Sequence, residues 1–346
     1  MTDRVPTMVA GALADAARDA CEFPKYLANH LPMILVALDA LGADGPRLTE
    51  YAERYRAAKG LVPAAEPVRP ITAADWRDHL GDRDRETDYR RFFVAEVERV
   101  GIAAALAEYT AVLADGIGAS ALHGLMRLCY ALLREDPDEV GHALGYIAAT
   151  YLPAPPLPDA PGEPPADPTE LVRAVTGMSE VFAAVPRSMD LLWHRIEASF
   201  ATPAFGPVAA RLATGPAALT RMAAGSLTLY AGSNCFTSLH VVTGTFWTRV
   251  VAAYLDPPTA ARLLVRYWQV VLALLPAVRH TGLLPAGDED TLRRTPVPSW
   301  AEIAAATVVS DDEHDISLVY SAHREHAVYG DPLYEGVAAR RVGLLP

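Results

Sequence analysis

Apolar residues recur at intervals of three and four positions through most of this chain, and this repeat constrains the fold more than any other feature. Such spacing places apolar side chains along one stripe of an α-helix. The period-two alternation that is typical of half-buried strands is hard to find. The clearest helical segments are residues 47–61, 90–116, 121–135, 137–152 and 258–280. The sequence therefore predicts an all-α fold.

The clearest interruption of the helical pattern is LPAPPLPDAPGEPPADPTE, residues 152–170. So much proline excludes regular helix and favours an extended, semi-rigid connector. The length of 346 residues allows two medium domains or one large domain. From composition alone, the connector either separates two domains or crosses the surface between two halves of one core.

The balance of charges narrows the classes of partner. The chain has 30 basic and 42 acidic residues, a net charge of −12, which argues against nucleic acid and anionic membrane surfaces. The segment from Met222 to Thr248 has no formal charge and is long enough to cross a bilayer. However, Ser, Thr, Asn, Gly and His interrupt it, so buried helices near a cavity are the better interpretation.

The cysteines and the common catalytic motifs add two expectations. Cys21, Cys129 and Cys235 are widely spread and include no CxxC pair, so we expect buried thiols in a reducing cytosol and a cytoplasmic protein. Phosphate-binding loops of the GxGxxG and GxxxxGK[ST] types and the GxSxG elbow are missing from the sequence. Nucleotide-driven and esterase chemistry therefore lack their usual signatures.

Four histidines lie in apolar or neutral helical surroundings. His30 stands at the start of an apolar helix, which we expect Asn29 to cap and Gly42 to end. His123, His240 and His314 lie on three further helical segments. They are either four unrelated core histidines or ligands of one metal site, because the interior of a helical bundle is where facing helices build such sites.

Four motifs taken together resemble a known family. YLANHLPMILVALDALGA, ALHGLMRLCYAL, FTSLHVVTGT and DDEHDISLV occur in the order of the questin oxidase-like family of oxidoreductases, from about residue 23 to 340. Members are associated with oxidative tailoring of aromatic polyketides, including opening of anthraquinone rings. Since the likeness covers both sides of residues 152–170, it implies a single all-α catalytic unit over residues 1–346, a multi-helix bundle with a central cavity for metal and substrate.

The resemblance implies a non-haem iron site. In the family, four histidines and a carboxylated lysine hold Fe(II), which implies His30, His123, His240 and His314 as metal ligands here. Molecular oxygen would be the co-substrate. NADPH would be a reductant only for a monooxygenase outcome, and the chain shows no site for it.

One position departs from the family pattern, because Ser317 stands where the lysine is expected. The chain has only Lys25 and Lys59, so no neighbouring lysine is expected to replace it. Ser317 either leaves an open coordination position or a nearby carboxylate takes the place of the lysine. The candidates are Asp312, Glu313 and Asp315, whose alternative role is to stabilise the N-terminus of a helix. Loss of the metal is the third alternative.

Several other residues have a functional and a structural interpretation. Arg127, one turn after His123, either binds an anionic phenolate or pairs with an acidic neighbour in the fold. Thr243 either supports a ligand or bonds its own helix. Tyr130, Trp247 and Trp268 either wall a flat pocket or belong to the core. His79, His323 and His326 are expected on solvated faces.

Taken together, the sequence predicts a cytoplasmic non-haem-iron oxygenase that acts on a polycyclic aromatic polyketide resembling an anthraquinone. Ring cleavage, Baeyer–Villiger-type oxidation and hydroxylation all remain open, as do the exact substrate and the oligomeric state. The alternative is a metal-free protein of the same fold, acting as a histidine acid–base enzyme or a small-molecule-binding module.

Overall fold

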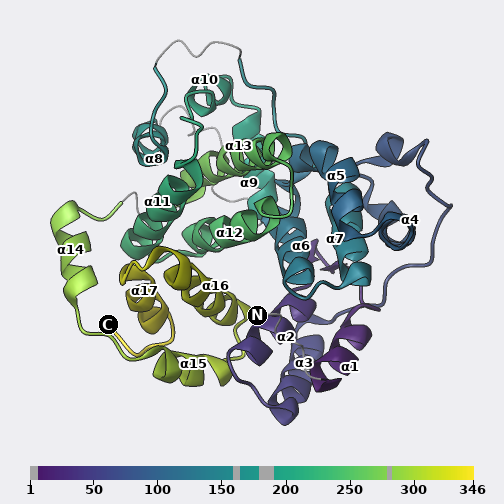
Figure 1. Ribbon diagram of the computed structural model, residues 1–346, viewed down its shortest axis with the longest axis horizontal. Coiled ribbons are helices and arrows are strands. Elements are labelled where there is room, and N and C mark those ends of the chain that lie inside the picture. Colours follow the sequence, from purple (N-terminus) through teal and green to yellow (C-terminus); the bar gives the residue numbers. More distant parts are fainter. Residues whose placement is uncertain (1–6, 159–163, 179–190, 279–282) are drawn as a thin grey trace.

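The computed structural model describes residues 7–158, 164–178, 191–278 and 283–346. In these residues the regular secondary structure is almost entirely helical, which confirms the all-α prediction (Figure 1). The α-helices are α1 (Thr7–Ala16), α2 (Leu31–Ala40), α3 (Gly45–Lys59), α4 (Glu86–Val100), α5 (Ile102–Leu113), α6 (His123–Leu133), α7 (Pro137–Ala149), α8 (Pro168–Gly177), α9 (Leu192–Phe200), α10 (Phe205–Ala209), α11 (Ala218–Ser233), α12 (Phe236–Ala252), α13 (Pro257–Leu274), α14 (Ala286–Arg294), α15 (Trp300–Val308), α16 (Glu313–Tyr329) and α17 (Leu333–Arg341).

The remaining regular elements are short. The 3₁₀ helices are η1 (Trp76–His79), η2 (Arg83–Arg85), η3 (Ala114–Gly116), η4 (Ala119–Leu122) and η5 (Leu275–Ala277). The strands β1 (Glu22–Phe23) and β2 (Leu27–Ala28) form one antiparallel hairpin just before α2. These elements are too short to carry a periodic hydrophobic pattern, and the sequence did not predict them.

Four helices from distant parts of the chain meet in the middle of the molecule. Helix α2 contacts α6 and α16, and α12 contacts the same two helices, so the four close into a ring (Figure 1). Each of these helices is buried along most of its length. The ring is the scaffold on which the candidate site is built.

Helix α2 begins one residue later than predicted. His30 is the N-cap residue rather than the first helical residue, and Leu31 opens the helix. The Asn29 side chain still satisfies a free helix N–H, because its Oδ1 accepts a hydrogen bond from the Leu31 nitrogen at 3.0 Å. Gly42, with φ of 97°, follows the helix in the left-handed conformation expected there.

The proline-rich connector is shorter than predicted at its C-terminal end. Helix α8 starts at Pro168, because proline is tolerated in the first turn of a helix. Asp167 and Glu170 form a capping box around that turn. Residues 159–163 of the connector lie outside the described residues. One hydrophobic core contains side chains from both sides of the connector, such as Phe93 and Trp268, and this shared core supports the single unit, which stays a prediction.

The uncharged segment from Met222 to Thr248 forms most of α11 and α12. Asn234 joins the two helices in the left-handed conformation, with φ of 41°. Nearly all side chains of the segment are buried, as expected. Among the described residues, none of the helices combines the length and the hydropathy that a bilayer crossing requires.

Candidate metal centre

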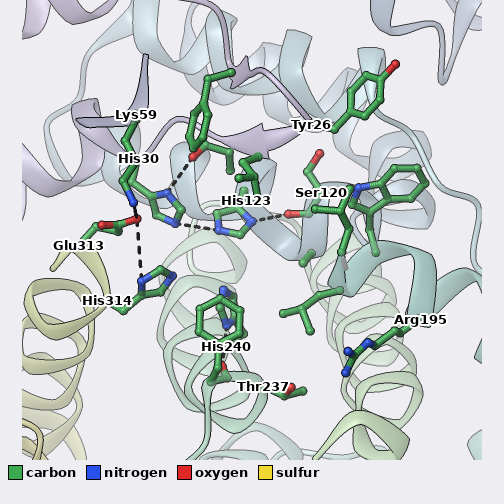
Figure 2. Close-up of a pocket in the computed structure, with 18 of the residues that line it drawn as sticks. Tyr26, His30, Lys59, Ser120, His123, Arg195, Thr237, His240, Glu313 and His314 are labelled. Atoms are coloured by element: carbon green, nitrogen blue, oxygen red, sulfur yellow. Dashed lines mark hydrogen bonds and ion pairs between the residues drawn. The ribbon is translucent and has the colours of Figure 1, made fainter. Parts of the chain in front are cut away.

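A cavity of about 640 Å³ opens at one end of the four-helix ring (Figure 2). His30, His123, His240 and His314 all line it. Ring centroids of neighbouring pairs lie 4.5 Å apart for His30–His123, 5.4 Å for His123–His240, 5.6 Å for His240–His314 and 5.3 Å for His314–His30. The structure therefore places the four predicted histidines around one cavity, and their role as metal ligands stays a prediction. Among the described residues, the possible ligand atoms that all lie within 4.8 Å of one another are those of Asp312, Glu313 and His314.

Each histidine comes from the N-terminal end of its helix. His30 caps α2, His123 is the first residue of α6, and His314 is the second residue of α16. His240 follows one turn into α12. The N-terminal end of a helix carries partial positive charge, so four such ends disfavour protonated imidazole and favour an anionic ligand in the cavity.

The Nδ1 atoms of all four histidines face oxygen atoms of the protein. His30 Nδ1 lies 2.9 Å from the Ala28 carbonyl, His240 Nδ1 lies 2.8 Å from the Phe236 carbonyl, and His123 Nδ1 bonds the Ser120 carbonyl. His314 Nδ1 lies 3.2 Å from the carboxylate Oδ1 of Asp312. Because these oxygens only accept hydrogen bonds, Nδ1 carries the proton of each neutral ring and Nε2 keeps a lone pair.

Two of these lone pairs face each other. The Nε2 atoms of His30 and His123 are 2.8 Å apart in the buried end of the cavity. Two nitrogen lone pairs at that distance repel each other unless a cation, either a proton or a metal ion, binds to both. A cation shared by the two nitrogens would relieve this repulsion.

Burial disfavours a proton as the cation between the two nitrogens. It lowers the pKa values of His30, His123 and His240 well below the ordinary value, and neighbouring histidines of the cluster lower each of them further. These rings are therefore neutral at physiological pH. Neutral imidazole nitrogen is a good ligand for iron, zinc and copper.

The lowered pKa values predict the pH dependence of the metal-free protein. In the unfolded chain a histidine takes up its proton near pH 6.5, whereas the folded cluster stays neutral to lower pH. Below pH 6.5 the unfolded state binds more protons, so acidification from about pH 7 to about pH 5 should lower the free energy of unfolding. Each such histidine adds a slope of up to about 1.4 kcal/mol per pH unit.

Denaturant unfolding of chelator-treated protein across this pH range measures that slope. The variant His240→Asn should take up about one proton fewer on unfolding, so its slope should be smaller by up to about 1.4 kcal/mol per pH unit. Equal slopes for the variant and the wild type would mean that His240 is protonated in the folded, metal-free protein.

A lysine reaches the cavity, contrary to the sequence-based expectation. Lys59, the last residue of α3, lines the cavity, and its Nζ lies 2.6 Å from Oε1 of Glu313 (Figure 2). Glu313 also lines the cavity and is buried, and its Oε1 lies 4.0 Å from Nδ1 of His314. Since 254 positions separate Lys59 from Glu313, no local pattern links them.

The three acidic candidates of the final motif have different positions. Asp312 caps α16 by accepting a hydrogen bond from the His314 backbone nitrogen at 2.8 Å. Asp315 forms an ion pair with Arg341 at 2.5 Å. These two have the structural role that the sequence left open, and Glu313 is the one that lines the cavity with the histidines.

Ser317 is not among the described residues that line the cavity. Its side chain is buried one turn deeper along α16, near the core residue Tyr130. Side chains of a helix lean toward its N-terminus, so His314 reaches the cavity from the first turn and Ser317 does not. The expected open coordination position at Ser317 is therefore not supported.

Arg127 also lies away from the cavity. Its guanidinium binds both carboxylate oxygens of Glu139, at 3.0 and 2.9 Å, and a third contact of 3.1 Å reaches Sγ of Cys21. The side chain is fully buried in this ion pair, which is the structural alternative that the sequence left open. The proposed contact between Arg127 and a phenolate is therefore not supported.

The aromatic wall of the cavity differs from the predicted one. Tyr130, Trp247 and Trp268 are core residues, and Thr243 bonds the Leu239 carbonyl of its own helix at 2.9 Å. Here the structural interpretation is correct in each case. The aromatic side chains that line the cavity are instead Phe23, Tyr26, Trp193 and Phe236. Lys59, Arg195 and Thr237 add polar groups around them.

Only one of the missed residues had a local signal. Phe236 precedes His240 by four positions, a spacing that places two side chains on one helix face, and the ring centroids lie 4.6 Å apart. Phe23 and Tyr26 lie in a hairpin too short to predict. Trp193 and Lys59 come from helices whose approach to the cavity depends on tertiary packing.

A family model described as questin oxidase-like matches residues 27–322, which include all four histidines. A search of the curated proteins gives no match.

Proposed function

The chain belongs to the questin oxidase-like family, and from this premise we propose that it is a metal-dependent oxygenase of aromatic polyketide tailoring. Membership alone implies an oxidoreductase. We further propose that Fe(II) is the metal, that molecular oxygen is the co-substrate, and that the organic substrate is a polycyclic phenol resembling an anthraquinone.

The observation that carries this proposal is the contact of 2.8 Å between Nε2 of His30 and Nε2 of His123. Two nitrogens that bind one metal ion at about 2.0–2.1 Å, at a right angle, are about 3 Å apart. All four Nδ1 atoms are occupied by protein oxygens, the usual arrangement of metal-binding histidines. His30, His123, His240 and His314 would therefore hold the metal through Nε2.

Four neutral imidazoles leave the charge of a divalent ion uncompensated. Glu313 is a carboxylate that lines the same cavity, and its Oε1 lies 4.0 Å from Nδ1 of His314. We propose that Glu313 supplies the negative charge that the carboxylated lysine supplies in the family. A bound iron ion would supply the redox chemistry for oxygen activation, which amino-acid side chains do not provide.

The rest of the cavity suits a flat aromatic phenol. Its volume of about 640 Å³ is within the range of pockets that enclose a drug-sized ligand. Tyr26, Trp193 and Phe236 offer ring faces and edges for stacking. The four helix N-termini favour the phenolate over the phenol.

Metal analysis and oxygen uptake together test this function. The purified protein should contain about one iron or surrogate divalent ion per chain. After chelation and reloading with Fe(II), it should consume oxygen on addition of a dihydroxyanthraquinone, and the mass of the product should show whether one or two oxygen atoms enter. Repeating the assay with and without NADPH separates the monooxygenase from the dioxygenase outcome.

The competing proposal is a metal-free protein of the same fold. Full turnover by chelator-treated protein would favour a histidine acid–base enzyme. Tight binding of the aromatic ligand without turnover or metal would favour a binding module. Either result would overturn the metal-dependent oxygenase.

A further inference from the structure

A carboxylate outside the histidine cluster is connected to the residues that orient His30 and His123. Glu22 belongs to the β1–β2 hairpin, and its side chain is only 10% exposed. Arg83 Nε donates a hydrogen bond to its Oε2 at 3.0 Å, and the Ser120 hydroxyl donates one to its Oε1. Both carboxylate oxygens are therefore held by defined donors.

The backbone of Glu22 is paired with the residue that orients His30. In the hairpin, Glu22 lies opposite Ala28, and the Ala28 carbonyl accepts the hydrogen bond of His30 Nδ1. A further bond of 2.8 Å from the Asn29 nitrogen to the Cys21 carbonyl extends this pairing to the residue before His30. A shift of Glu22 therefore moves the acceptor on which His30 depends.

The side chain of Glu22 is connected in the same way to His123. Ser120, Ala121 and Leu122 have φ values of 43°, 52° and 72°, a left-handed conformation that residues with a β-carbon adopt only when their surroundings hold them there. The Ser120 carbonyl accepts the hydrogen bond of His123 Nδ1. The bond from the Ser120 hydroxyl to Glu22 therefore helps to hold the strained turn that orients His123.

Arg83 connects the same carboxylate to the aromatic wall. Its guanidinium lies 5.4 Å from the ring centroid of Tyr26 and 4.6 Å from that of Trp193, within the range of cation–π contact. Both rings line the cavity. A ligand that moves these rings therefore moves the group that fixes Oε2 of Glu22.

We propose that Glu22 is a positioning residue that sets the spacing of the His30 and His123 rings, and that Arg83 makes this spacing sensitive to an aromatic ligand in the cavity. Glu22 acts through Ala28 and Ser120 rather than by touching a reacting group. The inference rests on the proposed function, since the spacing matters only if the two rings bind a common metal ion.

Cobalt binding tests the first half of the proposal. Co(II) is the probe because its visible spectrum reports the number and geometry of its ligands. The variant Glu22→Gln keeps the size of the side chain but places an amide where Arg83 and Ser120 both require an acceptor. We expect its affinity for Co(II) to fall about 10–100-fold and its spectrum to change, as for other groups that orient metal ligands.

Glu325→Gln is the matched control. Glu325 is 1% exposed and pairs with Arg249 at 2.6 Å, but it lies far along α16 from the cavity. The Glu325→Gln variant should be less stable than the wild type but should bind Co(II) with the same affinity. If Glu22→Gln fails to fold, Ser120→Ala removes the hydroxyl donor alone and should show the same spectral change. Wild-type affinity and spectrum in either variant would overturn the proposal.

Arg83→Lys tests the second half. Lysine keeps the positive charge near Glu22 but lacks the planar guanidinium that stacks on two rings. Anthracene has no oxygen or nitrogen atom that could bind a metal, so an effect of anthracene on Co(II) affinity does not come from ligation of the ion. We expect the aromatic ligand to change the Co(II) affinity of the wild type several-fold and that of Arg83→Lys hardly at all. Equal changes would overturn the role of Arg83. Wild-type protein that binds no Co(II) would instead overturn the proposed metal centre itself.

Discussion

Replacing His240 by Ala is expected to abolish metal binding and oxygenase activity together while the protein remains folded. His240 is 2% exposed, and its ring contacts the rings of both His123 and His314. Its removal leaves three imidazoles and should weaken divalent metal binding by more than the 10–100-fold that loss of an outer supporting group causes. Alanine is the best helix former, so α12 should persist.

Three measurements check this result on one preparation: metal content, oxygen uptake with a dihydroxyanthraquinone, and helicity by circular dichroism. His323→Ala is the control, since His323 is exposed on α16 and is not among the described residues that line the cavity. It should retain metal and activity. An active His240→Ala variant with normal metal content would remove His240 from the metal centre.

Replacing Glu313 by Gln is expected to have the second largest effect. The substitution keeps the shape of the side chain but removes the negative charge beside His314, and it leaves the Lys59 ammonium facing the metal site unpaired. We expect the affinity for Fe(II) to fall by about 100-fold or more, because the attraction of the carboxylate is lost and the Lys59 ammonium then repels the bound cation. Titration with Fe(II) under anaerobic conditions measures this change, with Asp315→Asn as the control in the same turn.

Lys59→Met distinguishes two sources of the negative charge. If Glu313 supplies it, loss of the competing ammonium should leave metal binding unchanged or tighter. If metal is lost as in Glu313→Gln, Lys59 itself must supply the charge as a carboxylated lysine. That outcome would appear as a bicarbonate dependence of metal binding in wild type, and it would contradict the proposed role of Glu313.

Local patterns in the sequence were sufficient for the helices and for the identity of the four histidines. Helical periodicity depends on contacts within a few residues, so it can be recognised without knowledge of the fold. Each of the four motifs also contains one of the four histidines. Boundaries were less certain, as at His30, because a cap residue and a first-turn residue differ only in backbone conformation.

The functional role of Arg127 was predicted from its position one turn after His123, and that of Ser317 from the place of the lysine in the family motif; the structure supports neither. Both lie about one turn beyond a histidine, where a side chain often shares the same face. The histidines, however, lie at or within one turn of the N-terminal ends of their helices, so a residue one turn later is buried in the core. Ser317 therefore faces Tyr130, and Arg127 pairs with Glu139.

The sequence by itself determined a helical chain with four histidines in apolar or neutral helical surroundings. Only the tertiary structure decided that α2, α6, α12 and α16 close into a ring. It also decided that Lys59 and Glu313, 254 positions apart, form an ion pair, and that Glu22 accepts a hydrogen bond from Ser120. The physical reason is that helix formation is governed by neighbouring residues, whereas a cavity is lined by whichever side chains the packing of distant helices leaves at its surface.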